Sequence, residues 1–174
     1  MVDQATGFFT LPVLVEFLRY EIDGYAQTLA NERFITPLCV VAIGVDTLPA
    51  VQDQDERDRL LRMVAGTVQR ATRAADRLAR HGDELLALLR RTLSANVRDF
   101  YAPRLRAMLA EVSPDIPSAP TVSLGVASLS EHVVRSPHDM IAKAMRALEA
   151  ARQNGPGSLA VYDLREMPID TAQA

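Results

Sequence analysis

The sequence predicts an α/β fold (an α+β sandwich) in which helices cover a central sheet of about five strands, and two observations carry that prediction. Segments with apolar residues at helical spacing alternate along the chain with short apolar runs that favour strands. A glycine-containing polar stretch, residues 81–84, separates two further apolar runs and is typical of a β-hairpin turn. The length of 174 residues suits one domain, residues 1–174.

The first half of the chain contains two predicted helices and three predicted strands. Residues 11–29 and 55–74 place apolar side chains on one face at helical spacing, so each predicts a helix. Residues 38–45 form a continuous apolar run, which is typical of a strand buried on both faces. Residues 77–80 and 85–89 flank the predicted turn and form the two strands of the hairpin.

The second half continues the alternation. Residues 94–112 predict a helix, although Pro103 must either begin that helix or kink it. Residues 121–127 predict a second buried strand, and residues 158–162 predict the last strand. Residues 137–153 predict a helix that has proline at its start and is followed by Asn-Gly. Because 38–45 and 121–127 are the most continuously apolar strands, we expect them in the middle of the sheet.

The composition excludes several classes of protein. Hydrophobic residues make up 48% and charged residues 24%, which is typical of a globular chain. No apolar run has the length of a membrane span and the N-terminus carries no basic leader, so we expect a cytoplasmic protein without membrane contact. A single cysteine, Cys39, excludes an internal disulfide. The three scattered histidines argue against a histidine metal centre, so neither a metal nor a cofactor is expected.

The charge is uneven along the chain. The net charge is −3, but residues 55–106 contain 12 arginines against 7 acidic residues. A basic region of this kind attracts a phosphorylated small ligand, and it is equally typical of an arginine-rich, solvated helix surface. Few aromatic residues accompany the arginines, so we do not expect nucleic-acid binding.

Five short stretches together resemble a known family. Residues 3–9 (DQATGFF), 37–46 (PLCVVAIGVD), 80–85 (RHGDEL), 121–127 (TVSLGVA) and 144–155 (AMRALEAARQNG) are similar, in order and spacing, to motifs of the GGDEF domain of bacterial diguanylate cyclases. The resemblance implies a mostly antiparallel sheet. It also implies an ancestral activity, the joining of two GTP molecules into cyclic di-GMP with the help of metal ions held by carboxylates.

The departures from the family pattern indicate a degenerate domain without catalytic residues. Gly44 stands where the resemblance implies a metal-binding Asp, and the signature has lost one glycine. An arginine stands where the family keeps a lysine that contacts phosphate. The resemblance therefore implies a vestigial active site made of Asp46, Gly82, Asp83, Glu84 and Arg152.

A second motif suggests that the domain has kept a ligand. The family's inhibitory site for cyclic di-GMP carries an R-x-x-D motif, and Arg73-Ala-Ala-Asp76 has the same spacing from Gly82. The resemblance also implies an arginine from the following helix, either Arg104 or Arg106, often supplied by a second copy in a homodimer. An Arg/Asp pair at i, i+3 is equally typical of a surface ion pair, so both interpretations stay open. We expect both side chains of the motif to be exposed.

These observations predict a catalytically inactive domain that binds cyclic di-GMP through Arg73, Asp76 and Arg104 and acts as a receptor or regulatory adaptor through a partner protein. One alternative is a protein-interaction or scaffold module that binds no nucleotide. A second alternative is residual diguanylate cyclase activity that relies on Asp46 and Glu84.

Overall fold

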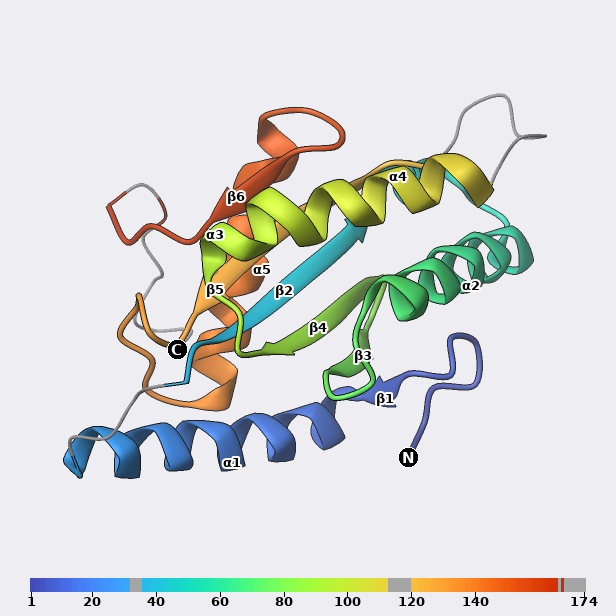
Figure 1. Ribbon diagram of the computed structural model, residues 1–174. Helices are drawn as coiled ribbons and strands as arrows, with labels where there is room; N and C mark the ends of the chain where they lie inside the picture. Colours follow the sequence, from blue (N-terminus) through green and yellow to red (C-terminus); the bar gives the residue numbers. More distant parts are fainter. Residues whose placement is uncertain (32–35, 113–119, 166, 168–174) are drawn as a thin grey trace.

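The computed structural model describes residues 1–31, 36–112, 120–165 and 167, which form one sheet with helices on both faces (Figure 1). The strands are β1 (Phe9–Thr10), β2 (Leu38–Val45), β3 (Arg77–His81), β4 (Glu84–Arg90), β5 (Val122–Ser128) and β6 (Leu159–Val161). The helices are α1 (Leu11–Ala30), α2 (Gln54–Ala71), α3 (Ser94–Asn96), α4 (Ala102–Val112) and α5 (Pro137–Gln153), with a 3₁₀ turn η1 (Leu48–Ala50) and a π-helical turn η2 (Val97–Tyr101).

The sheet has the order β1-β3-β4-β2-β5-β6 and is antiparallel at its centre. Strand β2 pairs antiparallel with both β4 and β5, and β3 pairs antiparallel with β4. The expected middle position of β2 and β5 is confirmed, because each has a neighbouring strand on both sides. The sheet has six strands and not five, because β1, only two residues long, pairs parallel with β3. A strand this short carries no alternation that a sequence pattern could reveal.

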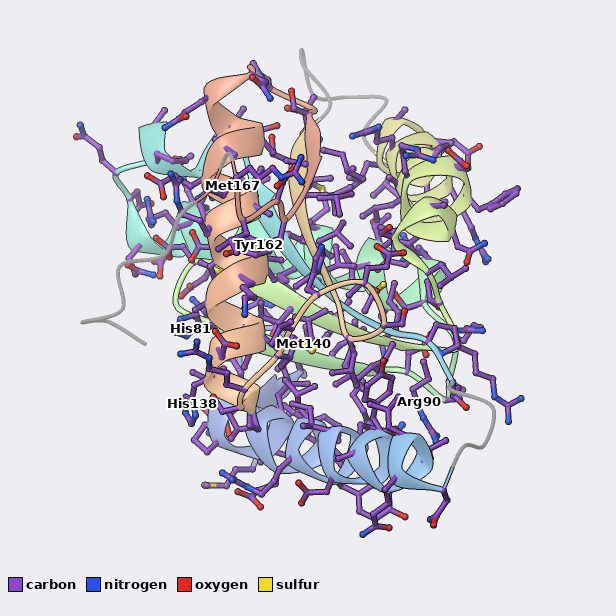
Figure 2. All side chains as sticks on the ribbon, turned by 90° about the vertical axis from the view of Figure 1, so that its left-hand side faces the viewer. His81, Arg90, His138, Met140, Tyr162 and Met167 are labelled. Atoms are coloured by element: carbon purple, nitrogen blue, oxygen red, sulfur yellow. The ribbon has the colours of Figure 1, made fainter. Side chains whose placement is uncertain are left out.

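Alternate residues of the strands build two separate apolar layers. Val41 and Ile43 of β2 pack with α2 and α4 on one face of the sheet. Val40 and Ala42 pack with α1 and α5 on the other face, and Met140 of α5 belongs to that second layer (Figure 2). Burial on both faces explains why β2 is apolar at every position.

Helix α5 lies directly on β5 because Gly125 has no side chain. A Cβ atom built on Gly125 would meet the backbone of α5, at 2.6 Å from Leu148 Cα. Close contact between the helix and the strand therefore requires glycine at this position. The contact sets the position of the last turn of α5, which carries Arg152.

Two predicted helices differ from the structure at their ends. The segment 94–112 is not one regular helix, because the π-helical turn η2 comes before α4. Pro103 has no N–H group, so it cannot donate the helical hydrogen bond to the Asp99 carbonyl. The π-helical turn η2 lies just before Pro103, where this bond is missing. Helix α2 ends at Ala71, so Arg73 and Asp76 lie in the turn beyond it. Across the described ranges, none of the helices combines the length and apolar character that a membrane crossing demands.

Candidate functional site

The first candidate region lies at the end of β2, where the sequence predicts a vestigial active site. The carboxylate of Asp46 accepts hydrogen bonds from Thr121 Oγ1 and Ser123 Oγ, both at 2.7 Å. It also accepts one from the Gly157 backbone N–H at 2.9 Å. Asp46 therefore ties the start of β5 and the segment before β6 to the end of β2, and both of its oxygens are occupied.

Glu84 at the hairpin is paired with Arg152 of α5. Both terminal nitrogens of Arg152 donate to the same oxygen of Glu84, each at 3.2 Å. The guanidinium lies over Gly44, because a Cβ atom at that position would be 2.8 Å from Arg152 Cζ. The arginine therefore fills the space beside β2 into which any side chain at residue 44 would project.

The hairpin turn between β3 and β4 has its own set of ion pairs. Gly82 has a φ of +62°, which glycine adopts without strain, and His81 pairs with Glu84 across a two-residue turn. Asp83 of this turn forms an ion pair with Arg57 of α2 at 2.5 Å. The structure therefore brings all five predicted vestigial residues to one end of the sheet, with each of their three carboxylates already partnered. Within the described ranges, no group of three or more His, Cys, Asp or Glu side chains is arranged to hold a metal ion.

The second candidate region is a cavity of about 180 Å³ between the turn after α2, the end of β4 and helix α4. Arg73, Asp76 and Arg104, the three residues predicted to contact cyclic di-GMP, all line it. Arg106, the alternative to Arg104, is not among the lining residues. Three residues selected from two separate stretches of sequence therefore meet at one place.

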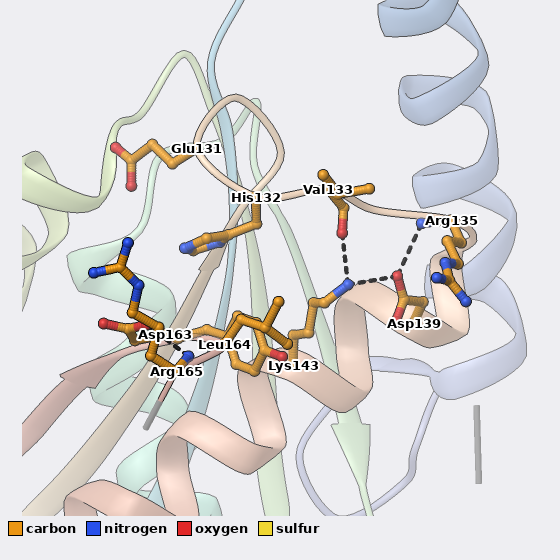
Figure 3. A pocket seen from close by; sticks show the side chains of 10 residues that line it. Glu131, His132, Val133, Arg135, Asp139, Lys143, Asp163, Leu164 and Arg165 are labelled. Atoms are coloured by element: carbon orange, nitrogen blue, oxygen red, sulfur yellow. Dashed lines mark hydrogen bonds and ion pairs between the residues drawn. The ribbon is translucent and has the colours of Figure 1, made fainter. Parts of the chain in front are cut away.

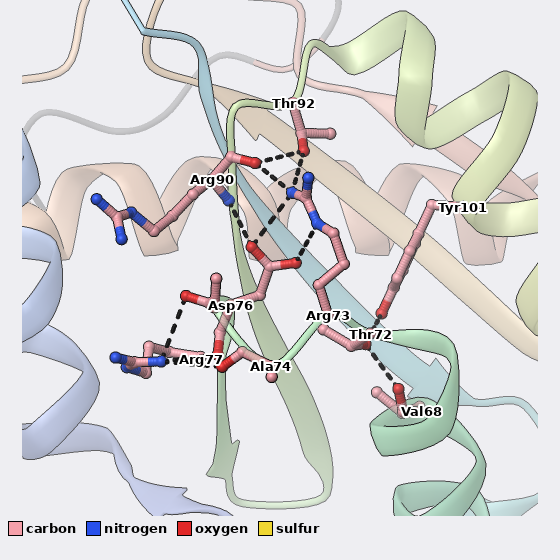
Figure 4. A network of polar contacts seen from close by, with 10 residues as sticks. Val68, Thr72, Arg73, Ala74, Asp76, Arg77, Arg90, Thr92 and Tyr101 are labelled. Atoms are coloured by element: carbon pink, nitrogen blue, oxygen red, sulfur yellow. Dashed lines mark hydrogen bonds and ion pairs between the residues drawn. The ribbon is translucent and has the colours of Figure 1, made fainter.

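Arg73 is held in a network that leaves part of its guanidinium free (Figure 4). Its Nε donates to Asp76 Oδ2 at 3.0 Å, and its Nη2 donates to Asp76, to Thr92 Oγ1 and to the Arg90 carbonyl. Its Nη1 makes no hydrogen bond with the part of the chain that the structure describes. The guanidinium is thus fixed in orientation while one of its edges remains available to a ligand.

The expectation that both residues of the motif are exposed is wrong for Asp76. Its side chain is 2% exposed, whereas that of Arg73 is 55% exposed. Asp76 Oδ1 accepts the Arg90 backbone N–H at 2.9 Å, so the carboxylate also fixes the end of β4. Asp76 thereby supplies an acceptor to a backbone N–H group at the end of β4. The same carboxylate orients Arg73 from beneath the cavity.

Aromatic residues that the sequence analysis did not single out complete the cavity. Phe100 lines it and is exposed, whereas Tyr101 is more enclosed and shares a hydrogen bond of 2.9 Å with Thr72 Oγ1. Burial raises the pKa of the Tyr101 hydroxyl to about 12. The signal that could have found these residues is an adjacent aromatic pair inside an arginine-rich helix of a chain with few aromatic residues.

The family follows from a match that covers most of the chain. Residues 2–158 match the family model described as the diguanylate cyclase, GGDEF domain. The chain therefore belongs to the GGDEF domain family, which confirms the resemblance drawn from the five motifs. A comparison with curated protein sequences found no match.

Solved structures share the fold over almost the whole chain. The GGDEF domain of TpbB, also called YfiN, from Pseudomonas aeruginosa has a TM-score of 0.78 and 20% identity, over 95% of this chain and 96% of that chain. The GGDEF domain of DgcB from Caulobacter crescentus, solved in complex with c-di-GMP, has a TM-score of 0.73 and 21% identity, over 92% and 95%. The diguanylate cyclase SiaD of Pseudomonas aeruginosa, solved with its activator SiaC, has a TM-score of 0.76 and 22% identity, over 92% of this chain and 61% of that chain.

Proposed function

We propose that this GGDEF domain does not synthesise cyclic di-GMP, and that it binds this dinucleotide in the cavity beside Arg73 and acts through a partner protein. The observation that carries the proposal is the meeting of Arg73, Asp76 and Arg104 at one cavity. Their spacing along the chain was interpretable either as a ligand motif or as a chance ion pair, and a shared cavity favours the ligand motif.

The inactive half of the proposal rests on the carboxylates at the end of β2. Joining two GTP molecules needs metal ions, and such ions need carboxylate oxygens that are free to bind them. Gly44 supplies no oxygen, Asp46 accepts three hydrogen bonds within the protein, and Glu84 is neutralised by an arginine. The residues present therefore do not fit a pair of divalent cations, and we derive no catalytic step through them.

The binding half rests on the chemistry that the cavity offers. The free edge of Arg73 and the exposed guanidinium of Arg104 can each donate two hydrogen bonds to a phosphate or to a guanine edge. The exposed ring of Phe100 offers a surface on which a base can stack. A cavity of about 180 Å³ holds one base, so the rest of the dinucleotide would lie along the surface toward Arg104.

Asp76 has a positioning role in this proposal. It orients Arg73 and does not touch the ligand, because its side chain is buried beneath the arginine. This differs from direct guanine recognition by the carboxylate, which an exposed Asp76 would have allowed.

The partner is proposed on two grounds. Every element of the described chain belongs to the one sheet and its covering helices, so an output must be carried by another molecule or by a region outside these elements. SiaD, a protein of the same fold, has been solved with an activator protein, which supports a protein partner for this domain without identifying it. A second copy of the chain is one such partner, since Arg104 is exposed and can reach a neighbouring molecule.

Isothermal titration with cyclic di-GMP and with GTP tests the proposal. We expect cyclic di-GMP to bind and Arg73→Ala to weaken it about tenfold to hundredfold, the loss expected for a charged donor. Arg152→Ala is the matched control, because it removes an arginine from the other region. We expect the Arg152→Ala variant to bind cyclic di-GMP with the same affinity as the original protein. A cyclase assay with GTP and either Mg²⁺ or Mn²⁺ should yield no product.

Two results would overturn the proposal. Product formation above background would restore the residual cyclase interpretation. Absence of binding at high micromolar cyclic di-GMP, or equal binding by Arg73→Ala, would leave the scaffold interpretation, which a pull-down with the purified domain would then pursue.

A further inference from the structure

A larger cavity lies on another part of the molecule and shares no lining residue with the one beside Arg73. It has a volume of about 580 Å³, a size typical of small-molecule sites. Three segments enclose it: the loop after β5, the first half of α5 and the residues that follow β6 (Figure 3). Neither half of the proposed function uses these residues.

The only lysine of the chain, Lys143, lies in the wall of this cavity and is buried. Its Nζ donates to the Val133 carbonyl at 2.6 Å and to Asp139 Oδ2 at 2.7 Å. An ammonium group has three N–H donors, so these bonds leave one donor for another acceptor. The Nζ is 5.7 Å from the centre of the Tyr162 ring, which places the ammonium group and the ring at the same wall.

Tyr162 carries a polar atom that the protein does not satisfy. The residue is 4% exposed and lines the cavity, and its hydroxyl has no hydrogen-bond partner among the residues described. Burial, together with the charges of Asp139 and Asp163, raises the pKa of this hydroxyl, so it stays protonated and keeps its O–H donor. Buried hydroxyl groups are normally paired, so this one calls for an acceptor from outside the protein.

The remaining lining groups also present more free donors than free acceptors. Three carboxylates line the cavity, and each already accepts a hydrogen bond within the protein. Glu131 accepts from Ser94 Oγ at 2.5 Å. Asp139 accepts from Lys143 and from the Arg135 backbone, and Asp163 accepts from the Arg165 backbone. The guanidinium groups of Arg135 and Arg165 form no ion pair with any residue that the structure describes. The formal charges of the lining side chains balance, so the excess of unpaired donors, and not net charge, selects the ligand.

The other walls are apolar or neutral. Val133 and Leu164 contribute aliphatic surface. The His132 ring meets the Tyr162 ring edge-on at 5.4 Å between centroids, and its Nδ1 accepts the Ser128 backbone N–H at 3.0 Å. Burial lowers the pKa of His132, so the imidazole is neutral at neutral pH and adds a flat, uncharged surface.

We propose that this cavity binds a small organic carboxylate whose oxygens accept hydrogen bonds from Lys143 and Tyr162 and whose flat apolar body packs against His132 and the aliphatic wall. The unpaired donors select the carboxylate, and the neutral walls select the apolar body. This site is independent of the proposed binding of cyclic di-GMP, since the two cavities have no lining residue in common.

Benzoate is the probe, and NMR titration of the labelled full chain is the measurement. We expect benzoate to shift the resonances of Lys143 and His132 with a dissociation constant of about 1 mM, as befits a fragment of this size. Benzyl alcohol, which lacks the carboxylate, and inorganic phosphate, which lacks the ring, should each bind at least about tenfold more weakly. Arg73→Ala should leave the benzoate titration unchanged.

Tyr162→Phe separates a ligand site from a structural one. Removing an unpaired buried hydroxyl should leave the melting temperature equal or raise it, because the free protein loses no hydrogen bond. The same change should weaken benzoate about fivefold to tenfold, because the bound carboxylate loses a donor. The double variant Asp139→Asn/Lys143→Met removes both charges of the buried pair together and should abolish binding.

Three outcomes would overturn the proposal. The first is the absence of any shift at about ten times the expected dissociation constant. The second is a Tyr162→Phe variant that binds benzoate as well as the original protein. The third is phosphate binding as tight as that of benzoate, which would mark a plain oxyanion site.

Discussion

Two arginine–carboxylate pairs on this domain are built from the same groups and differ in how deeply the carboxylate is buried. At the end of β2, the Arg152 side chain is 36% exposed and that of Glu84 is 19% exposed. Beside α4, the Arg73 side chain is 55% exposed and that of Asp76 is 2% exposed. The first pair lies over a glycine and fills a gap, whereas the second borders a cavity.

Under the proposed function, the difference explains how one region of the fold could lose a ligand site while the other keeps one. When the carboxylate is almost fully buried, as Asp76 is, it fixes the guanidinium and leaves one edge of the arginine facing the cavity. When the arginine lies in the gap beside a strand, as at Gly44, the pair closes the space that a ligand would use. Pairing alone therefore does not decide whether an arginine is available to a ligand. In these two pairs, the depth at which the carboxylate is buried decides it.

The largest expected effect comes from the contact that positions Arg152. Gly125→Ala should lower the free energy of unfolding by about 3 kcal/mol, because the new Cβ meets the backbone of α5 and the helix must move away. Urea denaturation measures the change. Arg73 lies on another part of the domain, so folded Gly125→Ala protein should still bind cyclic di-GMP.

Gly66→Ala is the matched control for that substitution. Gly66 lies inside α2, and its nearest neighbour would be 3.8 Å from the new Cβ, which is ordinary contact. Alanine is the better helix former, so this variant should gain about 0.5–1 kcal/mol. A Gly125→Ala variant as stable as the original would show that α5 does not depend on this close approach.

The second-largest expected loss of stability comes from breaking the Arg73–Asp76 pair. Asp76→Ala should cost about 2 kcal/mol, because the Arg90 N–H loses its acceptor and the Arg73 guanidinium loses its anchor. Thermal melting measures the loss, and titration should show weaker cyclic di-GMP binding as well. Asp99→Ala removes a partner of an exposed ion pair and should change stability by less than about 0.5 kcal/mol. Equal costs for the two variants would contradict the structural role of Asp76.

Tyr101 lines the cavity beside Arg73, and its hydroxyl should make the free energy of unfolding depend on pH. Its pKa is raised to about 12 in the folded state, above its usual value of about 10, so the unfolded chain ionises first as the pH rises. The stability that the neutral hydroxyl contributes is therefore complete below about pH 10 and is lost progressively toward pH 12. Relative to Tyr101→Phe, the original protein should lose about 1.4 kcal/mol between neutral pH and about pH 11. Parallel denaturation curves for the two proteins across this window would contradict the burial of the hydroxyl.

Much of the fold was predictable because its elements follow simple periodicity. The all-apolar run of β2 and the proline at the start of α5 both identify their elements without tertiary information. Strand β1 was missed because two residues show no periodicity. The sequence predicted only that Pro103 begins or kinks its helix, and not the π-helical turn before it.

The candidate sites were predictable in place and not in detail. The motif spacing named Arg73 and Asp76, and the resemblance added Arg104 or Arg106. Arg73, Asp76 and Arg104 line one cavity, but no pattern in the sequence says that Asp76 is buried. Burial depends on the end of β4, whose Arg90 N–H lies 14 residues away and binds this carboxylate. The cavity around Lys143 was missed for the same reason, because Tyr162 reaches it from a segment beyond α5.

The smallest expected effect is on the first pair. Arg152→Ala should change the free energy of unfolding by less than about 1 kcal/mol, because both partners keep contact with solvent and the pair is screened by salt. Gly44→Ala should give a similarly small change, since its Cβ would meet only the flexible end of Arg152 and that side chain can swing away. Urea denaturation at low and high salt measures both variants, and the two differences from the original protein should converge at high salt. Gly44 and Gly125 occupy paired neighbouring strands, β2 and β5, so equal costs for Gly44→Ala and Gly125→Ala would show that the guanidinium is held as rigidly as the backbone. The gap over β2 would then be a fixed part of the core and not a former site closed by a movable side chain.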